Sequence, residues 1–295
     1  MKKSVLNSPR FLGLKKKRRK VLLKKILFLV FLFVLILVGL SFLSKWEKIN
    51  INGIQVSGNK VVETKMIEEI AREKVSGNYF WFFPKTNFLL YPRVEIAREL
   101  ADRFKRLKDI SIGVKNLRTL DISLTERTAL YTYCGWAPAE LDSTSQQCYF
   151  MDEDGYIFDE APYFSGQVYL KFYGLVHRPT AEEIVADKEN ILGSYFFESI
   201  FKKLISLNEI LKKIGVKPVI FFAEDTGDIK IFLSSTTTEL GPFIIFKSDA
   251  DFNQVAENLQ SVLATEPMQS DFKSKYSSLL YIDLRFGNKV YYKFK

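Results

Sequence analysis

The longest unbroken run of apolar residues lies near the N-terminus. Residues 26–44 are nineteen residues without a charged side chain, and a helix of that length spans roughly the 30 Å hydrocarbon core of a bilayer. A signal peptide would have an apolar region of only about 7–15 residues and a small-residue cleavage site. We therefore predict that residues 26–44 form a transmembrane helix, in preference to a signal peptide or a buried core helix.

The pattern over residues 47–126 predicts a small α+β module. Alternating or apolar runs predict strands over residues 49–56, 110–114 and 120–124. Apolar residues spaced by three and four predict a helix over residues 64–74 and a second helix opened by Pro92. The expected apolar positions are Met66, Ile67, Ile70 and Ala71 in the first helix, and Val94, Ala97, Leu100, Ala101 and Phe104 in the second.

The most aromatic stretch, YFWFFPK at residues 79–85, lies between these two helices. Because aromatic side chains dominate burial in cores, the simpler interpretation is that it fills the space between the helices and the sheet. The alternative is an exposed patch that docks on lipid or on another protein.

Residues 127–295 form a second predicted domain that is rich in strands. Helices are expected over residues 195–214 and 251–264, with a shorter one after Thr180, where Glu183 completes a capping-box signal. Together the patterns predict an α+β fold in which a mostly antiparallel sheet carries helices on one face. Strands are expected over residues 129–134, 148–151, 156–158, 168–172, 219–223, 229–234, 243–246 and in two terminal runs.

The charge distribution supports a membrane protein rather than a nucleic-acid-binding one. The formal net charge is +9, but residues 1–25 hold eleven Lys or Arg, which leaves 32 basic against 34 acidic residues in the remainder. Basic flanks stay cytoplasmic, so the tail of residues 1–25 is expected inside, with Lys24 and Lys25 at the inner interface and Trp46 at the outer one. The run Lys15–Lys20 would contact anionic lipid.

Outside the cytoplasm, the two cysteines have a simple interpretation. Cys134 and Cys148 bracket a polar stretch, each beside a tyrosine, and a disulfide is favoured in an oxidising compartment. Two free buried thiols are the alternative. Two cysteines and the lone His177 supply too few ligands for a zinc site.

No motif in the sequence indicates an enzyme, a cofactor or a metal site. The stretch DEDG at residues 152–155 lacks the spacing and the distal glutamate of an EF-hand, and it indicates an Asp-Gly turn between strands. His177 has no serine or cysteine motif around it and is expected in a loop. The carboxylate pairs lie on the solvated faces of helices, and no glycine-rich phosphate loop occurs.

These features together resemble the FtsQ/DivIB family of bacterial division proteins. The resemblance rests on the basic tail, the single span, and three motifs: V-S-G-N after the first strand, L-x-I-x-L-x-E-R from Leu120 to Arg127, and Y-I-D-L-R-F from Tyr281. The cysteine pair and the stretch from Gly174 to Gly193 depart from the family pattern. The resemblance covers essentially the whole chain, and it makes residues 47–126 similar to a POTRA domain.

What the resemblance implies is a non-enzymatic scaffold in the cell membrane. The POTRA-like domain would help recruitment through other division proteins, and residues 127–295 would hold partners similar to FtsB (DivIC) and FtsL, with FtsB extending the sheet at the last strand. Two other classes stay open: a POTRA-bearing chaperone or translocation component, and a membrane-anchored cell-wall enzyme. The first would need tandem modules or a pore domain.

The last fifteen residues, YIDLRFGNKVYYKFK, predict a hairpin with an open outer strand. A three-residue loop at 287–289 would pair Phe286 with Val290, Leu284 with Tyr292 and Ile282 with Phe294 on one apolar face. The outer strand is then a template for an added strand, and its lysines would repel most accidental ones. The expected partner-binding residues are Arg285, Lys289, Val290, Tyr291, Tyr292, Lys293 and Phe294.

Overall fold

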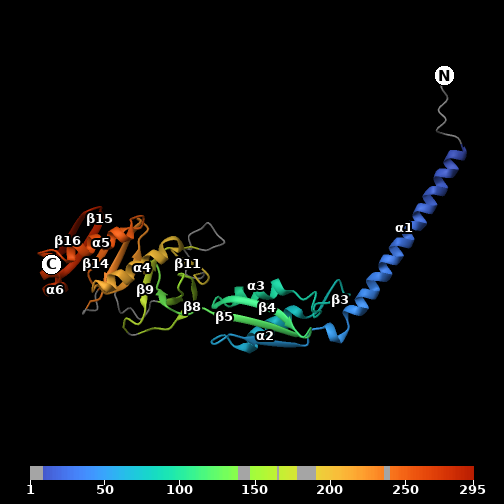
Figure 1. Cartoon of the computed structure of the whole chain (residues 1–295), viewed down its shortest axis with the longest axis horizontal. Helices are drawn as coiled ribbons and strands as arrows, with labels where there is room; N and C mark the ends of the chain where they lie inside the picture. The colour runs from blue at the N-terminus through green and yellow to red at the C-terminus, as the bar shows by residue number, and fades with distance from the viewer. Residues whose placement is uncertain (1–8, 139–146, 165, 178–190, 236–239) are drawn as a thin grey trace, which may run out of the picture. The chain divides into compact units, whose positions relative to one another are not determined.

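The computed structural model describes residues 9–138, 147–164, 166–177, 191–235 and 240–295 (Figure 1). The short helix expected after Thr180 lies outside these residues. The chain divides into two compact units, the first made of residues 1–100 and 109–124 and the second of residues 101–108 and 125–295.

The first unit opens with α1 (Pro9–Ser44). Its part from Arg18 to Ser44 is, by length and composition, long and apolar enough to cross a membrane. Most of its described side chains are exposed, including Lys24 and Lys25, whereas Ser41 and Ser44 near its C-terminal end are buried. The prediction of one apolar N-terminal helix of spanning length is therefore confirmed.

A small three-stranded sheet, in the order β1-β5-β4, follows α1. β1 pairs in parallel with β5, so Gly53 lies opposite Thr119 and Ser57 opposite Ser123. The elements, in chain order, are η2 (Glu47–Ile49), β1 (Gly53–Ser57), α2 (Thr64–Val75), β2 (Asn78–Tyr79), β3 (Phe83–Pro84), α3 (Arg93–Arg103), β4 (Leu107–Lys115) and β5 (Thr119–Glu126).

The helices bury slightly different stripes from those expected. In α2, Ile67, Ile70, Ala71 and Val75 are buried, but Met66 is exposed.

In α3, the buried residues are Ile96 and Leu100, while Val94 and Ala101 are exposed. Our expected stripe for α3 was therefore wrong at Val94 and Ala101, whereas Leu100 is buried and Ala97 and Phe104 are half-buried. Positions 92, 96 and 100 repeat every four residues, so they line one side of the helix with Pro92 at its start.

The aromatic segment does not fill the core as we had expected. β2 and β3 pair as a short hairpin, and its turn exposes Phe80, Trp81 and Phe82. Tyr79 and Phe83 at the base of the hairpin are only half-buried. The core interpretation is therefore wrong for the tip of this segment.

The second unit is built on a nine-stranded sheet in the order β16-β15-β14-β13-β12-β9-β6-β7-β8. Of its eight neighbouring pairs, five are antiparallel; the parallel ones are β6–β9, β9–β12 and β14–β15. The strands are β6 (Tyr131–Tyr133), β7 (Cys148–Met151), β8 (Ile157–Ala161), β9 (Leu170–Gly174), β12 (Pro218–Ala223), β13 (Asp228–Leu233), β14 (Phe243–Lys247), β15 (Leu279–Phe286) and β16 (Lys289–Phe294).

Helices and the larger core lie on one face of this sheet (Figure 1). α4 (Glu198–Lys213), α5 (Phe252–Leu263) and α6 (Met268–Ser274) contribute residues such as Phe201, Leu259 and Met268 to the cluster that contains Phe172 and Phe221 of the sheet. The opposite face has a smaller cluster with Tyr173, Ile220 and Phe232. Each of these residues is next in the chain to one that faces the larger core. The predicted mostly antiparallel sheet with helices on one face is confirmed.

Two local features of the second unit follow from residues singled out in the sequence. Cys134 and Cys148 form a disulfide between the end of β6 and the start of β7. Asp152 accepts hydrogen bonds at Oδ1 from the backbone N–H groups of Asp154 and Tyr156, which closes the expected Asp-Gly turn between β7 and β8. His177 lies in β10 (Val176–His177), which pairs with β11 (Tyr195–Phe196), so the expected loop is instead a short strand.

Candidate partner-binding edge

The terminal hairpin forms, but its register differs from the one we expected. Phe286 lies opposite Lys289 around a two-residue turn, Gly287 and Asn288, and Ile282 lies opposite Tyr292. The expected three-residue loop and its pairs are therefore wrong. Gly287 has φ +63°, which suits a tight two-residue hairpin turn, and the register then shifts between Asp283 and Phe286.

The two faces of β16 alternate strictly. Val290, Tyr292 and Phe294 are partly buried and pack against the large core. Lys289, Tyr291 and Lys293 are exposed on the opposite face. An added partner could therefore contact mainly the backbone of Val290, Tyr292 and Phe294. It could also contact the side chains of Lys289, Tyr291 and Lys293.

The register shift moves Phe286 from the expected apolar face to the outside. Its side chain is 56% exposed, and its ring packs edge-on against Tyr291 with the ring centroids 5.3 Å apart. The sequence pattern does not identify Phe286 as a candidate site residue, because strict alternation from Ile282 and Leu284 places position 286 inside.

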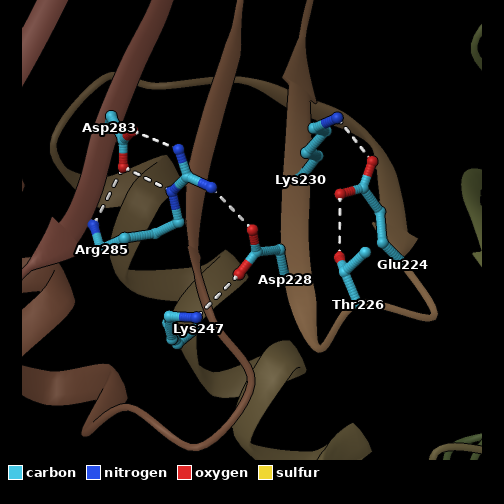
Figure 2. Close-up of polar contacts among 7 residues, drawn as sticks. All are labelled: Glu224, Thr226, Asp228, Lys230, Lys247, Asp283 and Arg285. Carbon is cyan, nitrogen blue, oxygen red and sulfur yellow. Dashed lines mark hydrogen bonds and ion pairs between the residues drawn. The ribbon is translucent and has the colours of Figure 1, made fainter.

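Arg285 occupies an ion-pair network rather than a free position on the edge (Figure 2). Its Nε and Nη2 donate to the two carboxylate oxygens of Asp283 at 3.0 and 2.7 Å, and its Nη1 donates to Asp228 Oδ2 at 2.8 Å. Lys247 Nζ lies 3.6 Å from the other oxygen of Asp228. Arg285 thus joins β15 to β13 across β14, and its guanidinium is bonded within its own sheet.

The network changes the ionisation of its members. Burial acts to raise the pKa of Asp283, but the hydrogen bonds and charge of Arg285 outweigh burial and leave that pKa lowered. The hydrogen bonds to Asp283 and then to Asp228 raise the pKa of Arg285 further above its ordinary value. At neutral pH Asp283 and Arg285 are therefore held in their charged forms.

A second ion pair lies near this network at the β12–β13 turn (Figure 2). Lys230 Nζ donates to Glu224 Oε1 at 2.5 Å and lies 5.4 Å from the ring centroid of Phe243. Thr226 donates to the other oxygen of Glu224. These contacts fix the turn next to Asp228.

β16 forms one end of the large sheet, and its outer side pairs with no strand in the part of the chain that the structure describes. The turn of the hairpin is hydrogen-bonded to α5, because Asn258 Nδ2 donates to the backbone oxygen of Gly287 at 2.9 Å. β16 is therefore a supported strand with an open edge.

The opposite end of the sheet is different. The Ile157 N–H of β8 donates to Ser194 O at 2.9 Å, and Ile157 O accepts from Gly193 N at 2.8 Å. Arg106 also forms an ion pair with Asp159 of β8. Part of that edge is covered by the chain itself, so β16 is the better template for an added strand.

The surroundings of the open edge are cationic and aromatic. Lys289 and Lys293 are exposed beside the pair of rings formed by Phe286 and Tyr291. A pocket of about 560 Å³ lies at the C-terminal end of β16, lined in part by Tyr276, Leu279 and Lys295. The edge is thus suited to a segment that brings acidic and apolar side chains with its backbone.

Among the described residues there is no group of three or more His, Cys, Asp or Glu side chains that could hold a metal ion. Compared with models of protein families and with curated proteins, the chain matches none of them.

Proposed function

We propose that this chain is a non-enzymatic, single-pass membrane scaffold of the FtsQ/DivIB kind. In this proposal α1 spans the cell membrane with the N-terminus inside, and both folded units lie outside. The first unit, POTRA-like in its order of elements, helps recruit other division proteins. The second unit holds partners similar to FtsB (DivIC) and FtsL by strand addition at β16.

The observation that carries the proposal is the open outer edge of β16. An added strand would satisfy the unpaired N–H and C=O groups of residues 289–294, and these backbone bonds would supply affinity. Lys289 and Lys293 would favour an acidic strand and oppose a basic one, a second copy of β16 included. The same lysines therefore provide both protection and specificity.

Two adjacent proline substitutions test strand addition directly. In an antiparallel hairpin, neighbouring residues point their N–H groups to opposite sides, so one of Tyr291 and Tyr292 donates to β15 and the other donates outward. Tyr291→Pro and Tyr292→Pro are each made in the full chain and compared by thermal unfolding. We expect the variant that unfolds like the unaltered chain to lose capture of the FtsB-like partner in a pull-down.

Charge reversal gives the matched specificity test. Lys293→Glu on β16 is expected to weaken capture of the same partner strongly, whereas Lys203→Glu, at an exposed lysine of α4, is expected to leave it unchanged. Full capture by the well-folded proline variant, or by a chain that lacks residues 289–295, would contradict strand addition at this edge.

A further inference from the structure

The β2–β3 hairpin presents its aromatic residues outward from a constrained turn. Phe80 and Trp81 have φ of +47° and +65°, a left-handed conformation that favours glycine or asparagine. Both side chains are 87% exposed, and that of Phe82 is 56% exposed. Large rings at a position that small residues favour, held in contact with solvent, indicate a surface for an apolar environment.

This hairpin is attached to the end of the apolar helix. Ser41 Oγ in the last turn of α1 donates to Phe82 O at 2.8 Å. On the other side of the hairpin, Asn87 Nδ2 donates to Ser44 Oγ at 3.0 Å. Both serines are only 7% exposed, so these contacts are part of a packed junction.

The connection between α1 and the sheet is bonded to the same junction. Asn50 Nδ2 donates to the backbone oxygens of Ser44 and Trp46, and Asn50 Oδ1 accepts from Thr86 Oγ1. The Ile51 N–H donates to Thr86 O at 2.8 Å. The segment that follows β3 is thus hydrogen-bonded to the segment that follows α1, and the hairpin moves with the end of the helix.

The depth of the hairpin tip follows from this attachment. A span of residues 26–44 places Ser44 at the outer boundary of the hydrocarbon core, and Ser41 lies about 5 Å below it at 1.5 Å per residue. Phe82, whose backbone oxygen accepts from Ser41, is then just below the level where acyl chains meet headgroups. Aromatic rings are most favourable at that depth.

The charges near the junction match the same environment. Lys48 Nζ lies 5.6 Å from the ring centroid of Trp46, and Lys85 Nζ lies 5.4 Å from that of Tyr79. Lysines beside aromatic rings are suited to the headgroup layer, where they meet anionic lipid. Leu89, 75% exposed and bonded through its N–H to Asn87, adds an apolar side chain to the junction.

We infer that the tip of the β2–β3 hairpin, residues 80–82, is embedded in the outer leaflet of the membrane that α1 crosses. The inference rests on the proposed function for the placement of α1. It makes the first unit a second membrane contact beside the helix, so that the orientation of this unit on the bilayer is fixed by two attachments instead of one.

Tryptophan quenching by brominated lipid tests the inference. The chain has three tryptophans, and Trp46→Phe with Trp136→Phe leaves Trp81 as the only reporter in the full chain. The protein is reconstituted in vesicles of phosphatidylethanolamine and phosphatidylglycerol, with or without bromine on the acyl chains. We expect a several-fold loss of Trp81 emission with brominated lipid and weak quenching by acrylamide.

Two further single-tryptophan chains separate the possible failures. A chain that retains only Trp46 reports insertion of α1 itself. The second chain carries Val61→Trp, with the three native tryptophans changed to phenylalanine. Its reporter lies beyond the far end of β1, where Val61 is 63% exposed. We expect acrylamide to quench this tryptophan strongly and brominated lipid to quench it little. Far-UV circular dichroism checks that each variant folds.

The outcomes are distinct. Quenching of both Trp46 and Trp81 by bromine supports the inference. Quenching of Trp46 alone by bromine overturns the inference and leaves the proposed function intact. The same conclusion holds if Trp81 is shielded from acrylamide only when a partner protein is added. Quenching of neither overturns the inference together with the proposed membrane placement of α1.

Discussion

Two glycines in similar backbone conformations show how much a single position can constrain the first unit. Gly58 and Gly77 have φ of +93° and +85°, a region that side chains other than glycine rarely adopt. A Cβ added at Gly58 would lie 1.9 Å from the backbone oxygen of Leu124, whereas one added at Gly77 would meet nothing within 4 Å. Gly58 is the glycine of the V-S-G-N motif, and this contact is the physical reason for it.

We predict that Gly58→Ala destabilises the first unit far more than Gly77→Ala. The control variant should cost about 1 kcal/mol for the left-handed backbone alone, and Gly58→Ala should cost about 2–4 kcal/mol because β5 must also shift. Hydrogen exchange of peptides from β5 and α2 measures both free energies. Equal losses of protection in the two variants would show that the contact with Leu124 carries no energy.

The Arg285 network gives a prediction that depends on pH. Arg285→Met leaves the buried Asp228 and Asp283 without their shared cation, which should cost about 3 kcal/mol at pH 7. The folded-state pKa of Asp283 lies below its ordinary value of 3.8, so the ionised form is favoured in the folded chain. This stabilisation is present above about pH 4 and is lost as the pH falls through the lowered pKa.

The two chains should therefore become more alike in acid. Urea unfolding of the full chain in detergent, followed by Trp136 fluorescence with the other two tryptophans replaced, measures the difference at pH 7 and at about pH 3. Lys203→Met, which removes an exposed cation of α4, is the control and should change neither value. A difference that stays constant between the two pH values would mean that Asp283 does not contribute through its charge.

At the scale of elements, the disulfide joins two strands that are already neighbours. β6 and β7 pair directly, and Cys134 and Cys148 are separated by 14 positions in the sequence. A closed loop of that length is worth about 3 kcal/mol through the entropy of the unfolded chain. Cys134 is buried beside Tyr173 and Ile220, so it also contributes packing.

We predict that Cys134→Ala with Cys148→Ala lowers the stability of the second unit by about 2–4 kcal/mol. The fold should persist, because the sheet and its larger core do not depend on this bond. Thermal unfolding with and without a reducing agent measures the effect. The reductant should destabilise only the chain that retains both cysteines; equal sensitivity of both chains would contradict this account.

The elements that the sequence predicted well are those with one dominant pattern. The strand over residues 148–151 has the expected limits, and the helix predicted over residues 64–74 begins at Thr64 and ends one residue later, at Val75. Apolar residues there are bounded by polar residues or turns. α3 was harder. Val94, Ala97 and Ala101 satisfy helical spacing as well as Ile96 and Leu100 do, and only the position of the sheet decides which stripe is buried.

The hairpin register could not be obtained from alternation alone. The sequence placed the outer strand and its exposed lysines correctly, but the register shift coincides with the contact between Arg285 and Asp228, which are 57 positions apart. The local pattern of apolar and polar residues cannot predict a contact between residues so far apart in the sequence. The outward position of Phe286, and with it half of the aromatic pair at the candidate site, depends on that shift.

At the scale of the whole molecule, charge is separated along the chain. Residues 1–25 carry eleven basic and no acidic residues, and the remainder carries a small excess of acidic ones. The proposed function needs β16 on the side of the membrane away from this tail. Orientation of a single span follows the lysines and arginines within about 15–20 residues of its ends, so Lys15–Lys20 are the residues that should decide it.

We predict that replacing the six basic residues at positions 15–20 with glutamine mixes the orientation of the chain. A C-terminal alkaline phosphatase fusion, active only outside the cytoplasm, should be highly active on the unaltered chain and lose much of its activity on the variant at equal protein level. Lys24 and Lys25 then face Lys45 and Lys48 across the span, so the basic residues next to its two ends are balanced and part of the chains should retain the C-terminal part inside. Neutralising Lys202, Lys203, Lys212 and Lys213 of α4 is the control and should not change the activity, since these residues lie far along the chain from the span. Phosphatase that is inactive on the unaltered chain would place β16 in the cytoplasm, out of reach of extracytoplasmic partners, and would remove the basis of strand addition there.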